Sequence, residues 1–242
     1  MSPLLDLVMR LLGGQRDEPG HQRQPVRADE WVPPAALVAL RGARVLLVED
    51  NDLNQLIATE LLEDAGFVVS VAAGVTIATM ESIVLNPVVR AMPNTPAVVG
   101  KGVTGVSGGS RTTDADVALV TALFETVGDV LVIPESKIDA LSTISGSGPA
   151  YVFYLIEELT KTARGLGFTD DQARVMVNGT FRGSADLLVS SGETPQELRR
   201  RVTSPKGTTE RAVAELEKAH LSELFDRATA AALARAKEIA AG

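Results

Sequence analysis

Three neighbouring residues near the C-terminus, Gly207, Thr208 and Thr209, are suited to binding an anion. They directly precede a segment, beginning near Glu210, that we expect to be helical. The first N–H groups of a helix have no partner within the helix, and the helix dipole favours negative charge there. The threonine hydroxyls add further donors. The plainer alternative is that Thr208 only caps the helix, and both roles can hold together.

Two glycine-rich stretches match known site motifs in their letters alone. Residues 100–105 read GKGVTG, but the dinucleotide fingerprint G-x-G-x-x-G needs a helix after it, and here a strand-like run follows. Residues 105–109 read GVSGG, as in the nucleophile elbow of hydrolases. That elbow needs a histidine base, and only His220 lies downstream, in a charged stretch. We therefore interpret the first stretch as a loop and the second as a turn at the end of a strand.

The composition excludes several classes of function. The chain has no cysteine and two histidines, which excludes thiolate chemistry and disfavours a histidine-rich metal site. Its net charge of -8 provides no basic surface, so we expect neither nucleic acid nor a membrane as a partner. No apolar run reaches the roughly 18 residues of a membrane span, and no signal-peptide cleavage site is visible. We expect a cytoplasmic protein.

Alternating apolar runs and helical periodicities predict the elements that position these residues. Residues 1–40 read as a linker or disordered tail, and order is expected from residue 41. Strands are predicted at 45–48, 67–72, 88–91, 103–107 and 130–133, with helices at 52–65, 76–84 and 114–127. Such alternation is typical of a wound α/β domain with a parallel sheet, here over residues 41–135.

After Pro134 the strand patterns end, and residues 136–242 are predicted to be all helical. Helices are expected at 149–165 and 221–241, and capping boxes at Thr169–Gln172 and Thr194–Glu197 predict two more helix starts. The alanine-rich helices bury little apolar area each. We therefore expect a second copy of the chain to complete this domain, in a homodimer or a larger homo-oligomer.

Several motifs together resemble one enzyme family. Residues 71–75 read VAAGV, 89–96 read VRAMPNTP, 145–151 read SGSGPAY and 202–209 read VTSPKGTT. Their order and spacing resemble pyrroline-5-carboxylate reductase, from about Ser70 to Gly242. The resemblance implies a homo-oligomer that transfers a hydride from NADPH or NADH to the imine carbon of 1-pyrroline-5-carboxylate, a small-molecule substrate, and forms proline.

The resemblance also assigns site residues. It places the substrate carboxylate against Ser204, Gly207, Thr208 and Thr209, and we take Thr209 as the catalytic hydrogen-bond donor to the ring nitrogen. It places the nicotinamide end of the cofactor against two short segments, Ala72, Ala73 and Gly74 in one and Met92, Pro93, Asn94, Thr95 and Pro96 in the other. One departure is that Lys206 stands where the family usually has glycine. If that position needs a positive φ, lysine there costs about 1 kcal/mol.

The residues before Ser70 differ from that family. Residues 44–69, from RVLLVEDNDLN to AGFVV, resemble the first strand, helix and second strand of a response-regulator receiver domain. The chain therefore reads as a chimera, a Rossmann-like and flavodoxin-like hybrid whose two strands of different origin can still pair. Glu49 and Asp50 match the acidic Mg²⁺ cluster of receivers and are weak metal candidates. The third strand ends without the phosphoacceptor Asp, so phosphorylation by the usual route is not expected.

The receiver-like segment carries acidic residues where the reductase family has a glycine-rich turn for the cofactor's pyrophosphate. Carboxylates there repel a pyrophosphate, so we expect impaired cofactor binding that Mg²⁺ partly restores. The leading interpretation is a pyrroline-5-carboxylate reductase homologue. Two alternatives stay open: a non-catalytic oligomerising scaffold, and a receiver-like signalling module without its phosphoacceptor.

Overall fold

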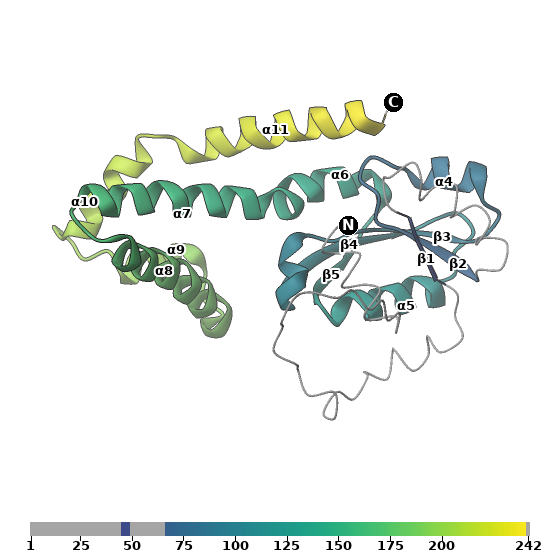
Figure 1. Ribbon diagram of the computed structural model, residues 1–242, viewed down its shortest axis with the longest axis horizontal. Helices are drawn as coiled ribbons and strands as arrows, with labels where there is room; N and C mark the ends of the chain where they lie inside the picture. The colour runs from purple at the N-terminus through teal and green to yellow at the C-terminus, as the bar shows by residue number, and fades with distance from the viewer. Residues whose placement is uncertain (1–44, 49–65, 241–242) are drawn as a thin grey trace, which may run out of the picture. The chain divides into compact units, whose positions relative to one another are not determined.

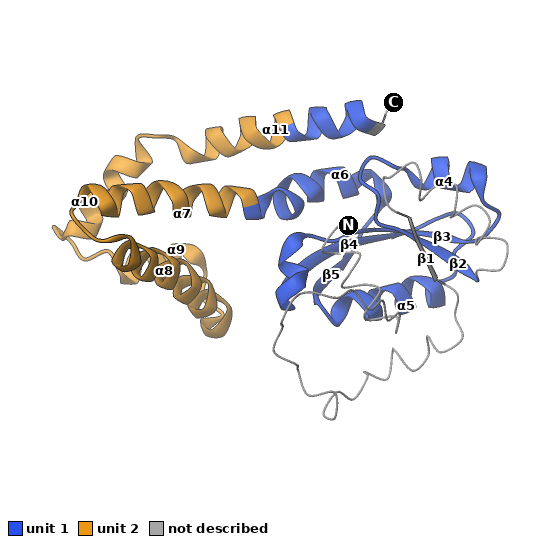
Figure 2. Cartoon of the chain, viewed as in Figure 1, with its two compact units in different colours: residues 1–149, 232–242 blue, residues 150–231 orange. Residues whose placement is uncertain are grey.

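The computed structural model describes residues 45–48, as backbone only, and residues 66–240. The predicted tail 1–40, the predicted helix 52–65 and the candidates Glu49 and Asp50 lie outside the described residues. Contacts divide the chain into two units (Figure 2): unit 1 comprises residues 1–149 and 232–242, and unit 2 comprises residues 150–231. The domain boundary predicted near residue 135 stays a prediction.

Unit 1 is built on a sheet whose strands follow one another in sequence order (Figure 1). They are β1 (Val45–Val48), β2 (Phe67–Ser70), β3 (Val88–Met92), β4 (Gly102–Gly108) and β5 (Gly128–Val132). β1, β2 and β3 pair in parallel, as do β4 and β5. The Rossmann-like parallel sheet and the helical segment that follows it agree with the predicted fold class, and β1 and β2 pair as expected.

One junction in the sheet corrects the prediction. β3 and β4 run antiparallel, with Met92 opposite Gly105, whereas a parallel sheet was predicted throughout. The connection between them holds only Pro93, Asn94, the 3₁₀ helix η2 (Thr95–Val99), Gly100 and Lys101. A parallel crossover needs a dozen or more residues, so this connection is too short to carry the chain back to the other end of the sheet. The sequence shows this length, but strand periodicity alone does not reveal strand direction.

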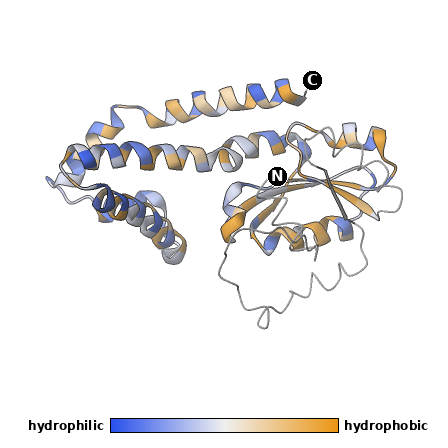
Figure 3. Cartoon of the chain, viewed as in Figure 1, coloured by the Kyte–Doolittle hydropathy of each residue, from blue (hydrophilic) through white to orange (hydrophobic). Residues whose placement is uncertain are grey.

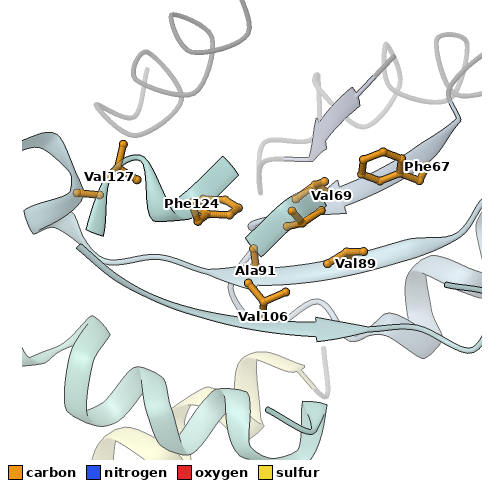
Figure 4. Close-up of a cluster of buried hydrophobic side chains, with 9 residues drawn as sticks. Phe67, Val69, Val89, Ala91, Val106, Phe124 and Val127 are labelled. Atoms are coloured by element: carbon orange, nitrogen blue, oxygen red, sulfur yellow. The ribbon is translucent and has the colours of Figure 1, made fainter. Parts of the chain in front are cut away.

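The two faces of the sheet bury alternate residues of the same strands, because successive side chains of a strand point to opposite faces. On one face Phe67, Val69 and Val89 pack beneath helix α5 (Asp114–Glu125). On the other face Val68 and Val88 pack against helix α4 (Ile77–Ile83). Figure 4 shows the first cluster, which also contains Ala91, Ala97, Val106, Val120, Phe124 and Val127. Burial on both faces explains why these strands read as continuous apolar runs.

The helices α4 and α5 begin after threonines whose hydroxyls accept a hydrogen bond from a free helix N–H group. Thr76 accepts from Thr79 at the start of α4, as predicted. Thr113 and Asp116 form a reciprocal capping box at the start of α5. After β5 come three short elements: the 3₁₀ helix η3 (Glu135–Lys137), α6 (Ile138–Leu141) and the π-helical turn η4 (Ser142–Gly146).

The remaining regular elements of the described residues are helices. They are α7 (Gly148–Gly165), α8 (Asp170–Ser191), α9 (Pro195–Arg201), α10 (Thr208–Glu217) and α11 (Leu221–Ala240). The capping box predicted at Thr169–Gln172 is confirmed. At α9 Thr194 accepts from the backbone of Glu197, but the Glu197 carboxylate accepts from Arg200 and Arg201. Figure 3 shows that these helices mix polar and apolar residues along their length, whereas the sheet is mostly apolar.

Candidate functional site

Two of the predicted segments meet at one edge of the sheet in unit 1. The turn 72–74 follows β2 and the loop 92–96 follows β3, and Ser70 pairs with Arg90 in parallel register. The carboxyl ends of neighbouring parallel strands lie at the same edge, which is where wound sheets bind ligands. Gly74 has a φ of +78°, a conformation that favours glycine and lets the backbone turn sharply out of β2.

The eight candidate residues at this edge differ in exposure. Ala73 and Thr95 are exposed, and Gly74 and Pro96 are half-buried. The other four, Ala72, Met92, Pro93 and Asn94, are buried. Of the eight residues, only Ala73, Gly74, Thr95 and Pro96 are accessible to a ligand at this edge.

The buried side chain of Asn94 shows how the loop 92–96 is held in place. Its Oδ1 accepts a hydrogen bond from the backbone N–H of Val103, at 2.8 Å, where β4 begins. Its Nδ2 donates to the carbonyl oxygen of Ser145 in η4, at 2.9 Å. The predicted cofactor residue Asn94 thus uses both ends of its amide to hold the loop against β4 and the π-helical turn. π-helical turns are rare and often lie at functional sites.

The predicted substrate loop in unit 2 is a tight turn that opens α10. Gly207 donates its N–H to the carbonyl oxygen of Ser204, at 3.0 Å, with Pro205 second and Lys206 third in the turn. Lys206 has a φ of +62°. A turn with proline second and a positive φ third is of type II, and its third position prefers glycine. A positive φ at this position explains both why the family usually has glycine there and why Lys206 bears a cost. The condition on which the predicted cost depended, a positive φ, is met.

The start of α10 corrects two details of the prediction. The helix begins at Thr208 rather than near Glu210, and Gly207 stands at the N-cap. Thr208 is therefore the first helical residue, so the capping role considered for it is wrong. The free N–H groups of the first turn include those of Thr208 and Thr209. The exposed hydroxyl of Thr208 and the half-buried one of Thr209 are available beside them.

The sequence interpretation missed Glu210, which takes part in the same turn. Its Oε2 accepts the backbone N–H of Lys206 at 2.8 Å. Glu210 stands at the third helical position, as the glutamate of a capping box does, but it accepts from Lys206, the residue before the N-cap, and not from Gly207 itself. The sequence did contain a signal, a glutamate three residues after the N-cap position. It was not recognised because Gly207 stands at the N-cap instead of the usual serine or threonine. Glu210 fixes the turn that presents Thr208 and Thr209.

The two misleading motifs lie largely in β4, so the loop interpretation of residues 100–105 is wrong from Gly102 onward. Residues 102–105 lie in β4, so no helix follows the fingerprint-like glycines. Ser107 lies within β4, is buried and pairs with Arg90 across the sheet, so residues 105–109 do not form an elbow. The predicted turn is found one residue further on, after Gly108. Within residues 66–240, no cluster of three or more His, Asp or Glu side chains could hold a metal ion.

Comparisons with known proteins identify the family of the chain. The family described as pyrroline-5-carboxylate reductase dimerisation matches residues 135–239. Pyrroline-5-carboxylate reductase of Mycobacterium tuberculosis is 39% identical over 222 residues, which cover 84% of this chain and 75% of that protein. The chain belongs to the pyrroline-5-carboxylate reductase family.

Other members of the pyrroline-5-carboxylate reductase family give the same result. The enzyme of Corynebacterium melassecola is 42% identical, over 71% of this chain and 64% of that protein, so the chain spans less than two thirds of this relative. The solved structure of the Coxiella burnetii reductase has a TM-score of 0.74 and 35% identity, and covers 81% of this chain and 75% of that one. That of Plasmodium falciparum, solved with NADP bound, has a TM-score of 0.72 and 27% identity, and covers 81% and 77%.

The length of one alignment bears on the expected chimera. Residues 70–242 are too few to supply 84% of a 242-residue chain, so the alignment with the Mycobacterium tuberculosis reductase includes residues before Ser70. The likeness to the pyrroline-5-carboxylate reductase family thus extends further upstream than the four motifs indicated. No comparison supports the receiver-like origin of residues 44–69, the scaffold alternative or the expected impairment, and that origin stays a prediction.

Proposed function

We propose that this chain reduces 1-pyrroline-5-carboxylate to proline with NADPH or NADH as the hydride donor. The observation that carries the proposal is the joint presence of a strand-end edge with small, accessible residues and a helix start with free N–H and hydroxyl donors. The first suits a nicotinamide ring, and the second suits a small carboxylate. Relatives that are 39–42% identical carry the name of this enzyme.

The described residues fit the nicotinamide end of a dinucleotide. Ala73 and Gly74 carry little side chain, so a flat ring can approach the backbone of the turn, and Thr95 and Pro96 form the neighbouring wall. When bound, the cofactor supplies the hydride. The pyrophosphate was predicted to meet Glu49, Asp50 and the two residues after them, which lie outside the described residues.

The work of the chain's own residues is then binding and orientation. The N–H groups of Thr208 and Thr209 hold the substrate carboxylate, with Ser204 and Gly207 shaping the turn around it. The Thr209 hydroxyl donates a hydrogen bond to the ring nitrogen, which orients the imine carbon for hydride attack. The hydrogen bonds to the carboxylate are charge-assisted, and such bonds are about twice as strong as neutral ones.

The proposal includes a homo-oligomer. The family that matches residues 135–239 is described by its dimerisation, and α7 presents several apolar side chains that are exposed in the single chain. They are Val152, Phe153, Tyr154, Leu155 and Leu159. A second copy of the chain is the occupant that this family description supports. Within residues 66–240, no helix is long and apolar enough to cross a membrane.

The deciding experiment follows the loss of NADPH absorbance when 1-pyrroline-5-carboxylate is added to the purified chain. The proposal expects proline to form in step with NADPH consumption. Titration of NADPH by calorimetry, in EDTA and then with Mg²⁺, tests the expected impairment at the same time. Low-micromolar binding in EDTA would show that no impairment exists. If the chain shows no NADPH binding and no turnover, either in EDTA or with Mg²⁺, the proposed reaction is refuted.

A further inference from the structure

One buried cation in unit 1 joins elements that are far apart in the sequence. Arg90 lies in the middle of β3 and is 2% exposed. Its Nη1 donates to Oε1 of Glu135 in η3 at 3.3 Å, and its Nη2 donates to Oδ1 of Asp139 in α6 at 2.9 Å. A buried guanidinium is stable only when it is paired and hydrogen-bonded, so both carboxylates have a structural role.

Both carboxylates pair with Arg90, Asp139 at the shorter distance, but they differ in one further contact. Oε1 of Glu135 also accepts the backbone N–H of Ile77, at 2.6 Å. Ile77 is the first residue of α4, and its side chain is buried in the core cluster beneath that helix. Asp139 has no such contact among the described residues. Glu135 therefore ties the start of α4 to β3, and Asp139 does not.

The position of this tie gives it a consequence at the candidate site. The chain leaves β2 at Ser70, forms the turn 72–74 and enters α4 at Ile77. The first end of this segment is fixed because β2 pairs with strands on both sides. The second end is fixed by Thr76, which caps α4, and by Glu135. A segment of so few residues follows any displacement of either end.

We propose that Glu135 is a positioning residue that sets the conformation of the cofactor-facing turn 72–74. This inference rests on the proposed function, because it assigns the turn to the nicotinamide end of NADPH. Glu135 acts through Ile77 and touches neither substrate nor cofactor. The contact is long-range: 58 residues separate the two partners, and one carboxylate oxygen serves both the helix start and the buried guanidinium.

The experiment compares three variants of the full chain by amide hydrogen exchange and by calorimetric NADPH titration. Glu135→Ala removes the contacts with both Ile77 and Arg90. Asp139→Ala removes only a partner of Arg90 and controls for the general loss of stability. Glu135→Gln keeps an amide oxygen that can accept the Ile77 N–H, and it is the milder change if Glu135→Ala does not fold.

The inference expects faster exchange over residues 71–77 in Glu135→Ala than in Asp139→Ala, with Glu135→Gln close to the wild type. It also expects the NADPH dissociation constant to rise about tenfold in Glu135→Ala, which is the size of effect that the loss of one hydrogen bond to a charged group produces. In Asp139→Ala the dissociation constant should stay unchanged. Equal exchange in the two alanine variants would overturn the inference, as would unchanged NADPH binding in Glu135→Ala. A wild type that binds no NADPH would instead overturn the proposed function, and the exchange comparison alone would then decide the role of Glu135.

Discussion

The side-chain amide of Asn94 donates to the carbonyl oxygen of Ser145 at 2.9 Å, across 51 residues of sequence. Together with its bond to the Val103 N–H, this contact joins the end of β3, the start of β4 and the turn that leads into α7. Asn94 is 9% exposed, so little water competes for these bonds. The residue that sequence resemblance placed against the cofactor is thus also a structural connector.

Replacing Asn94 with Ala should therefore lower the free energy of unfolding. Two hydrogen bonds at about 0.5–1.5 kcal/mol each predict a loss of about 1–3 kcal/mol, read from the midpoint of urea unfolding. Asn94→Asp keeps the oxygen that accepts from Val103, but its ionised carboxylate is buried and faces the Ser145 carbonyl oxygen, so a loss at least as large as that of Asn94→Ala is expected. An Asn94→Ala protein as stable as the wild type would show that these bonds contribute nothing.

Lys206→Gly should stabilise the protein. Lysine in the left-handed region strains the folded state by about 1–2 kcal/mol, and glycine relieves this strain. Glycine also raises the conformational entropy of the unfolded chain, which offsets about 0.5–1 kcal/mol of the relief. The free energy of unfolding should therefore rise by about 0.5–1 kcal/mol. The N–H that donates to Glu210 is kept, because it belongs to the backbone. Gly207→Ala is the matched control, since its Cβ would lie 2.9 Å from the Ser204 carbonyl oxygen and should destabilise the turn. A Lys206→Gly variant that unfolds earlier than the wild type would contradict this account.

Thr209→Ala should weaken the binding of proline, the product of the proposed reaction, by about 1–3 kcal/mol. The reason is the loss of the hydroxyl that the proposal places against the ring nitrogen; in proline this nitrogen is protonated, so it donates its hydrogen bond to the hydroxyl oxygen. Thr209→Ser keeps the hydroxyl and is expected to bind proline nearly as well as the wild type. Calorimetric titration with proline measures both variants. If Thr209→Ala retains the wild-type dissociation constant, Thr209 does not contact the ligand.

Glu197 predicts a pH dependence of stability. Hydrogen bonds from Arg200 and Arg201 lower the pKa of Glu197 from 4.5 to about 2. A carboxyl group with a depressed pKa stabilises the folded state above its unfolded pKa, and this contribution is lost as the pH falls from 4.5 to about 2. The melting temperatures of the wild type and Glu197→Gln should therefore differ near neutral pH and converge toward pH 2. Because the pair is exposed, added salt should reduce the difference. A gap that persists at the acidic end would exclude this ionisation as its cause.

The exposed apolar side chains of α7 predict that a charge placed among them weakens the homo-oligomer. Light scattering at micromolar concentration should give at least a dimeric mass for the wild type and a larger monomer fraction for Phe153→Lys. An apolar interface core does not accommodate an unpaired charge. Leu85→Lys is the control, because Leu85 is 90% exposed and lies outside residues 135–239. A monomeric wild type would refute the oligomer.

The sequence by itself determined the features that depend on local order. Threonine caps at Thr76 and Thr169 marked helix starts, and buried apolar runs marked β2 and β3. The glycine that the family usually has at this position marked Lys206 as costly before its φ was known, and the type II turn supplies the reason. The four family motifs allowed the function to be predicted, because each motif is one short segment whose residues are adjacent in the sequence.

The tertiary structure alone decided the features that join distant segments. Strand periodicity is the same in parallel and antiparallel pairs, so the reversal between β3 and β4 followed from the length of the connection and not from the pattern of the strands. The bonds of Asn94 to Ser145 and of Glu135 to Ile77 span 51 and 58 residues, and no local pattern encodes them. A hydrogen bond depends on where two atoms meet in space, and only the folded sheet brings these partners together.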